Sequence, residues 1–111
     1  MISQLEKLLG TPRDGALLRF SLGVEYMKSG DAARAVQFLR DAVERDPKYS
    51  AAWKALGRSL TEAGLQAEAI DAYTRGIEAA RAKGDRQAEK EMTVFRKRLE
   101  KAARGPATGP R

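Results

Sequence analysis

Residues 50–83 read SAAWKALGRSLTEAGLQAEAIDAYTRGIEAARAK, with apolar residues and glycines at regular intervals. It follows the spacing W-x2-L-G-x2-Y and then A-x3-F, except that Leu60 stands where the pattern has Tyr and Tyr73 stands where it has Phe. The residues in these places are Trp53, Leu56, Gly57, Leu60, Ala69 and Tyr73. Because residues three and four apart share one face of an α-helix, the spacing predicts two amphipathic helices with a turn at Gly64.

The same pattern occurs 34 residues earlier, in residues 16–49. Arg19 stands in place of the Trp, and Pro47 closes this copy. The other matching residues are Leu22, Gly23, Tyr26, Ala35 and Leu39. A fixed period of this length is typical of a helix-turn-helix unit that stacks on copies of itself. The sequence therefore predicts an all-α fold with two consecutive helical hairpins.

Residues 16–83 resemble the tetratricopeptide repeat (TPR) family, in which each repeat is one helical hairpin. The resemblance implies a right-handed α-α superhelix, a TPR-like solenoid, with repeat one at residues 16–49 and repeat two at residues 50–83. It also implies a non-enzymatic protein-protein interaction module, an adaptor or small scaffold, that binds a partner segment in a concave groove. Residues 1–104 are expected to form this single domain.

Gly23 and Gly57 occupy the same place in the two hairpins. Glycine inside a helix costs about 1 kcal/mol relative to alanine. Its hydrogen side chain lets the partner helix come close to the backbone, so we expect close packing to offset that cost at both positions. The pattern also predicts that Trp53, Tyr26 and Tyr73 are core residues and not ligand-stacking residues.

Residues 1–10 predict a short amphipathic helix, in which Ser3 and Glu6 fit an S-x-x-E capping box. Thr11 and Pro12 fit the start of the next helix, because Thr caps helices and Pro is tolerated at the first helical position. The apolar face of the first helix consists of Ile2, Leu5, Leu8 and Leu9.

The other helix ends carry ordinary signals. Gly30 supplies a left-handed turn, and Asp31 and Asp85 each fit a helix N-cap. Residues 85–104 predict a capping helix, since a terminal repeat needs a helix with a polar outer face. The apolar stripe of this helix is Ala88, Met92, Phe95, Leu99 and Ala102. The Gly- and Pro-containing residues 105–111 are expected to be a disordered tail.

The composition excludes several classes of chemistry. The chain has no Cys and no His, so disulfides, thiolate-bound metals and the commonest general base are missing. We expect no metal, no cofactor and no enzymatic activity, because the carboxylates spread along helix surfaces without a convergent pair; examples are Glu62, Glu68, Asp71 and Glu78. Without a long apolar run or a leader segment, the sequence predicts a soluble cytoplasmic protein with no membrane span.

The resemblance also implies a set of groove residues on the first helix of each hairpin. Carried over onto matching positions, these are Leu17, Phe20, Val24 and Met27, then Ala51, Lys54, Arg58 and Thr61. The capping helix is one residue later in register than the period, and there the set is Arg86, Glu89, Thr93, Arg96 and Lys97. Such a groove is apolar at one end and basic at the other. We therefore expect a partner segment with apolar anchors followed by Asp, Glu or a C-terminal carboxylate. Carboxylate-binding members of the family carry Asn where this chain has Val24 and Arg58, so their chaperone-tail mode of binding is not expected.

Two alternatives for this groove stay open. Lys54 and Arg58 could form only a solvated face. The N-terminal helix could also cover Phe20, Val24 and Met27, because its own apolar residues need a place to pack.

The basic charge of the chain is concentrated at one end. Residues 1–80 hold 11 Lys or Arg and 11 Asp or Glu, whereas residues 81–111 hold 10 and 4, the whole net charge of +6. An alternative function is therefore nucleic-acid or anionic-surface binding through Arg96, Lys97, Arg98, Lys101 and Arg104. Interleaved glutamates and few aromatic residues favour a solvated helix face instead. Self-association as a homodimer, which would bury an apolar stripe between two copies, is a further alternative.

Overall fold

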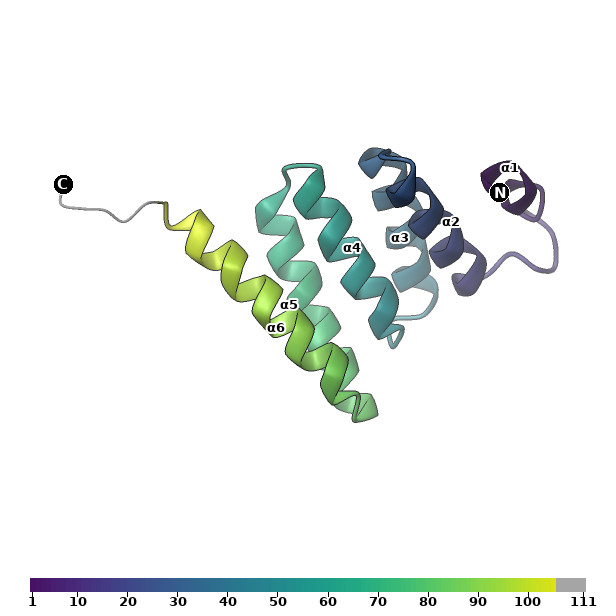
Figure 1. Ribbon diagram of the computed structural model, residues 1–111. Helices are drawn as coiled ribbons and strands as arrows, with labels where there is room; N and C mark the ends of the chain where they lie inside the picture. Colours follow the sequence, from purple (N-terminus) through teal and green to yellow (C-terminus); the bar gives the residue numbers. More distant parts are fainter. Residues whose placement is uncertain (106–111) are drawn as a thin grey trace.

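The computed structural model describes residues 1–105, which form six α-helices and, within that range, no strand (Figure 1). The helices are α1 (Ile2–Glu6), α2 (Ala16–Lys28), α3 (Ala32–Arg45), α4 (Ser50–Glu62), α5 (Gln66–Lys83) and α6 (Arg86–Ala103). The predicted all-α class is confirmed. The tail predicted at residues 105–111 lies outside the described residues except for Gly105.

The helices follow one another along a single long axis. Helix α2 packs on α3 and α4 packs on α5, which gives two hairpins, and α3 packs on α4 to join them. Helix α6 packs on α5 and also contacts α4, just as α4 contacts α2. Helix α1 lies against α2 at the opposite end of the row (Figure 1). The result is a solenoid of two hairpins and a long capping helix, 57 × 31 × 18 Å in extent.

The predicted caps and turns are present at the later helices. An Oδ1 atom accepts a hydrogen bond of 3.1 Å from the third following backbone N–H at both Asp31 and Asp85. Gly30, Gly64 and Gly84 have φ between +77° and +84°, the left-handed conformation that other residues avoid. These short turns make each pair of successive helices antiparallel.

Gly23 and Gly57 lie where a partner side chain packs directly on the helix backbone. A Cβ added at Gly23 would lie 2.4 Å from Cγ of Leu39, and one at Gly57 would lie 2.5 Å from Cε1 of Tyr73. The predicted close approach at both glycines is confirmed. Gly76, which the repeat pattern did not single out, is as tight, because its Cβ would lie 2.7 Å from Cβ of Trp53.

The residues of the repeat pattern form the core. Leu22, Leu39, Leu56, Leu60, Ala35 and Ala69 are buried together with the three aromatic residues of the pattern, Tyr26, Trp53 and Tyr73. Trp53 is 8% exposed, and its Nε1–H donates a 2.8 Å hydrogen bond to the carbonyl oxygen of Pro47. Pro47 therefore closes the first repeat and also satisfies the buried indole of the second.

The N-terminal segment differs from the prediction. Ser3 makes no capping bond, and Glu6 instead accepts a hydrogen bond from the hydroxyl of Tyr26. Helix α2 begins at Ala16, so Thr11 and Pro12 do not start it; they lie in a turn in which the Thr11 hydroxyl donates to the Leu8 carbonyl. The capping box and the early start of α2 were wrong because tertiary and turn contacts take up the same side chains.

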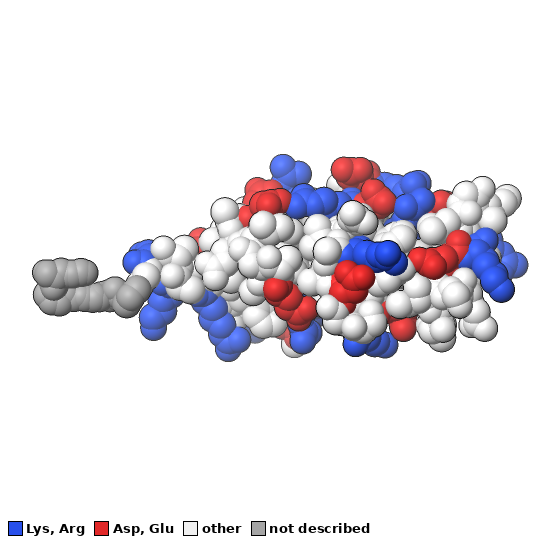
Figure 2. Space-filling model, turned by 90° about the horizontal axis from the view of Figure 1, so that it is seen from above, with Lys and Arg blue, Asp and Glu red and all other residues white. Residues whose placement is uncertain are grey.

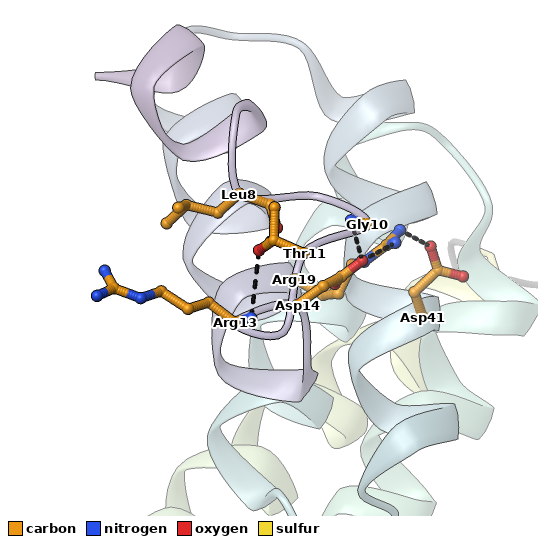
Figure 3. Close-up of polar contacts among 7 residues, drawn as sticks. All are labelled: Leu8, Gly10, Thr11, Arg13, Asp14, Arg19 and Asp41. Carbon is orange, nitrogen blue, oxygen red and sulfur yellow. Dashed lines mark hydrogen bonds and ion pairs between the residues drawn. The ribbon is translucent and has the colours of Figure 1, made fainter.

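A charged network holds that turn on the first hairpin (Figure 3). Arg19 donates from Nε and Nη2 to the two carboxylate oxygens of Asp14, both at 2.9 Å, and from Nη1 to Asp41 at 2.9 Å. The backbone N–H of Gly10 also donates to Asp14, at 2.9 Å. Arg19 thereby ties the segment before α2 to both α2 and α3.

Helix α6 buries most of its predicted stripe. Ala88, Met92 and Leu99 are buried and Phe95 is half-buried, but Ala102 is exposed. The prediction for Ala102 was wrong because the last turn of α6 extends past the start of α5 (Figure 1).

Candidate functional site

The first helices of the hairpins, α2 and α4, line one side of a groove together with α6. This groove has a volume of about 630 Å³. Its lining consists of Phe20, Val24, Met27 and Lys28 from α2, Ala51, Lys54, Ala55, Arg58 and Glu62 from α4, and Glu91 and Phe95 from α6. The apolar side chains come mainly from α2, and the charged ones from α4 and α6.

Most of the residues predicted on α2 and α4 meet in this groove. Phe20, Val24, Met27, Ala51, Lys54 and Arg58 all line it. Leu17 does not line the groove and is 68% exposed at the start of α2. Thr61 lies further along, in an adjoining hollow.

The residues predicted on α6 lie elsewhere. Lys97 is exposed outside the groove, and Arg96 points to α5, where its Nη1 lies 3.3 Å from the hydroxyl oxygen of Thr74. Glu89 likewise pairs with Arg81 of α5, and Arg86 lies near that same end. The expected lining by Arg96 and Lys97 was wrong. The buried stripe of α6 has a flank on either side: Arg96 lies on the flank beside α5, whereas the other flank, which carries Glu91, faces α4.

The groove continues into the adjoining hollow beyond Phe95. The two hollows share Arg58, Glu62 and Phe95. The adjoining hollow is lined by Arg58, Thr61, Glu62, Tyr73, Phe95, Arg98 and Leu99. Arg98 is thus a groove residue that the repeat pattern did not indicate. The one feature of the sequence that could have indicated it is its position seven residues after Glu91, on the same flank of α6.

The N-terminal helix does not cover the groove. None of residues 1–15 lines it, and Ile2, Leu5, Leu8 and Leu9 pack at the outer side of α2 instead. The contact of Glu6 with Tyr26 belongs to this outer side, where Tyr26 stacks on Phe38 of α3 at 5.6 Å between ring centroids. The alternative in which α1 fills the groove was therefore wrong.

The two predicted cations of α4 have different surroundings. Lys54 Nζ donates a 2.8 Å hydrogen bond to Glu91 across the groove, so it is no free solvated charge. Lys54 and Gln87 both donate to Glu91 and lower the pKa of that carboxyl. Arg58 is exposed and forms no ion pair with any residue between 1 and 105. Lys28, which also lines the groove, lies 3.5 Å from Glu25 of its own helix. The unpaired positive charge in the groove is therefore that of Arg58, with Arg98 beyond it.

Aromatic contacts shape the apolar part of the groove. Phe20 packs on Tyr49 with 4.9 Å between ring centroids, and Phe95 packs on Tyr73 with 5.7 Å. Both phenylalanines are half-buried, so each ring presents one side to the groove and rests the other on the fold.

Metal-ligating side chains do not gather in the described part of the chain, where no three Asp or Glu residues could hold an ion. Across residues 1–105, no helix has the length and apolar character that a membrane crossing requires.

Comparisons with known proteins agree with this geometry. The family model of the tetratricopeptide repeat matches residues 20–85. The TPR repeat-containing protein PA0015 of Pseudomonas aeruginosa is 52% identical over 102 residues, which cover 92% of this chain and 97% of that protein.

Solved structures show the same arrangement. The solution structure of protein BPP2914 from Bordetella parapertussis has a TM-score of 0.78 at 40% identity and covers 92% of this chain and 89% of its own. The TPR domain of Sgt2 from Aspergillus fumigatus has a TM-score of 0.79 at 30% identity, over 99% of this chain and 75% of its own. The repeat pattern, the two stacked hairpins and these relatives agree, and the chain belongs to the tetratricopeptide repeat family.

Proposed function

We propose that this protein is an adaptor whose groove holds a short segment of a partner protein, with an apolar side chain followed by Asp, Glu or a C-terminal carboxylate. Members of the family are protein-interaction modules, and the groove between α2, α4 and α6 is open. The observation that carries the proposal is the juxtaposition of an apolar hollow, formed by Phe20, Val24 and Met27, with the unpaired cation of Arg58.

The apolar hollow supports an anchor side chain. The whole groove, at about 630 Å³, is larger than a single Leu or Phe side chain, and the two phenylalanines that line it are each backed by a second ring. Burying one such side chain would contribute roughly 1.5–3 kcal/mol. An anchor of this kind fixes the position of the segment but not its direction.

The cations indicate in which direction the partner segment would lie in the groove. Because Lys54 is bonded to Glu91, the guanidinium of Arg58 is the first positive group that the segment meets beyond the hollow. Arg98 lines the next part of the groove. Guanidinium groups bind carboxylates through paired N–H donors, so an acidic residue or chain terminus would lie over Arg58 and Arg98.

The test is selection from a displayed library of peptides with free C-termini, followed by affinity measurements on one selected peptide. We expect Arg58→Glu to weaken binding by about tenfold or more, and Val24→Asp to do the same by disrupting the apolar hollow. Lys48→Glu is the matched control, since Lys48 is exposed and outside the groove. If the wild type and Arg58→Glu, both folded, bound every selected peptide with equal affinity, the groove would be rejected as the binding site.

A further inference from the structure

The outer face of α6 carries a straight line of cations, which we call the α6 basic stripe. Successive members lie four, seven, four and three residues apart, and at about 100° per residue this spacing keeps them on one face of the helix. The stripe consists of Arg86, Lys90, Lys97, Lys101 and Arg104. It runs for about 27 Å at the helical rise of 1.5 Å per residue. Ala88, Met92 and Leu99, which are buried against the fold, lie on the opposite face.

The glutamates of α6 do not neutralise this stripe. Glu89 pairs with Arg81 of α5 at 3.0 Å, Glu91 pairs with Lys54 of α4 at 2.8 Å, and Glu100 lies 3.9 Å from Arg96 on the adjacent flank. Within residues 1–105, no member of the stripe forms an ion pair. Figure 2 shows that the charged side chains nearest the grey atoms, beside the end of α6, are mostly blue. The interleaved carboxylates therefore leave the outer face strongly positive.

This face corresponds to one that is covered in the preceding hairpin. Helix α6 contacts α5 and α4 as α4 contacts α3 and α2, so it takes the place of the first helix of a further hairpin. In α4 the face on this side carries Leu56 and Leu60, which are buried where α5 packs on α4. On α6 this side carries Lys90 and Val94, and Val94 is 45% exposed in the middle of the stripe. The described part of the chain provides no helix to cover them.

We propose that the α6 basic stripe binds an acidic α-helix of a partner protein, which lies alongside α6 where the second helix of a further hairpin would lie. Charge complementarity argues for an acidic partner. The helical spacing of the cations argues for a helix, because a helix aligned with α6 can place carboxylates at the same intervals along its length. This surface is separate from the groove of the proposed function and does not depend on it.

Val94 favours a protein helix over nucleic acid. A phosphate backbone offers no apolar group to the exposed Val94, and the stripe has no aromatic side chain on which a base could stack. An amphipathic helix can place one apolar residue against Val94 between its carboxylates. A second copy of this chain is a poorer occupant, because α1 at the other end carries a single acidic residue, Glu6, which accepts a hydrogen bond from Tyr26.

The test uses a labelled synthetic helical peptide whose glutamates match the stripe, with one Leu placed against Val94, and a second peptide of the same composition whose glutamates are spread around the helix. We expect the matched peptide to bind about tenfold more tightly, because its ion pairs form as a set. Lys97→Glu with Lys101→Glu should weaken it by at least that factor, and Lys97→Gln with Lys101→Gln by less. The control is Arg13→Glu with Lys48→Glu, the same charge change at exposed positions away from the stripe.

The absence of Cys allows the position of the peptide to be trapped. With Val94→Cys, and Cys in place of the peptide Leu, added glutathione disulfide should cross-link the matched peptide faster than the spread one, whereas Leu17→Cys at the far end should not discriminate. Equal binding of both peptides would overturn the proposal. So would a DNA duplex that binds more tightly than the matched peptide, depends on Lys97 and Lys101, and is unaffected by Val94→Ser; that result would assign the stripe to nucleic acid.

Discussion

Arg19 stands in the first hairpin at the position that Trp53 holds in the second, 34 residues later, and the two side chains join their surroundings by different chemistry. Trp53 is buried and donates one hydrogen bond to the carbonyl of Pro47. Arg19 forms a two-pronged ion pair with Asp14 and a further bond to Asp41 (Figure 3). In the first repeat, ion pairs of Arg19 thus fix the segment before α2. In the second repeat, the buried Trp53 and its hydrogen bond to Pro47 fix the preceding turn.

Replacing Arg19 by Ala should lower the free energy of unfolding by about 1–3 kcal/mol, because two carboxylates lose their charged donors. Arg19→Lys should recover only part of this loss, since one ammonium group cannot match both oxygens of Asp14. Urea denaturation followed by circular dichroism measures both variants. Equal stability of Arg19→Ala and the wild type would show that the network is solvated and contributes nothing.

The same network predicts a dependence on pH. Hydrogen bonds from Arg19 and from the N–H of Gly10 hold the pKa of Asp14 well below its ordinary value of 3.8. The folded state therefore keeps Asp14 ionised where the unfolded chain takes up a proton, so this stabilisation is complete above about pH 4 and is lost as the pH falls further. Urea denaturation between neutral pH and about pH 3 should show a steeper loss for the wild type than for Arg19→Ala. If the stabilities of the wild type and Arg19→Ala fell equally with pH, the pH dependence would not come from the ion pair of Asp14 with Arg19.

The close packing at Gly57 predicts that alanine there lowers the stability of the protein, although helix propensity alone would favour alanine. Alanine would favour the helix by about 1 kcal/mol, but its Cβ would meet the ring of Tyr73, and overpacking of this kind costs roughly 1–3 kcal/mol. Gly57→Ala should therefore destabilise the protein. In the background of Tyr73→Leu the ring is gone, and the same substitution should be neutral or stabilising; a cost unchanged by Tyr73→Leu would mean that the contact is not the cause.

Trp53 predicts two separable losses. Trp53→Ala should cost roughly 3–5 kcal/mol through the cavity it leaves. Trp53→Phe keeps much of the apolar volume but leaves the Pro47 carbonyl without its donor, which costs about 1 kcal/mol in addition to lost packing. Thermal unfolding of both variants distinguishes the two effects. A near-neutral Trp53→Ala would remove Trp53 from the core and reopen a ligand-stacking role.

The repeat region could be predicted because its signals are local and periodic. Gly23 and Gly57 indicate close helix packing wherever the chain repeats, and Asp31 and Asp85 cap helices through their own third following N–H. At the N-terminus the same reasoning failed. The hydroxyl of Thr11 could cap a helix, but here it forms a hydrogen bond in a turn. Helix α2 starts only after Gly15, and Asp14 just before it is bonded to Arg19.

The candidate site was predictable only in part, for a geometric reason. On α2 and α4 the repeat pattern gives both the buried face and the direction of the next helix, so Phe20 and Arg58 could be placed. On α6 the apolar stripe gives the buried face alone. Whether Glu91 or Arg96 faces the groove depends on how α6 crosses α4 and α5, which no spacing in the sequence encodes.

Solenoids whose two ends match can join end to end and polymerise into filaments, because head-to-tail contacts do not close on themselves. Here α1 covers one end, where the exposed Glu6 and Lys7 cancel in charge, and the other end presents the cations of α6. The end at α1 therefore offers no row of carboxylates to match those cations. Because the two ends are not complementary, we expect the protein not to polymerise end to end.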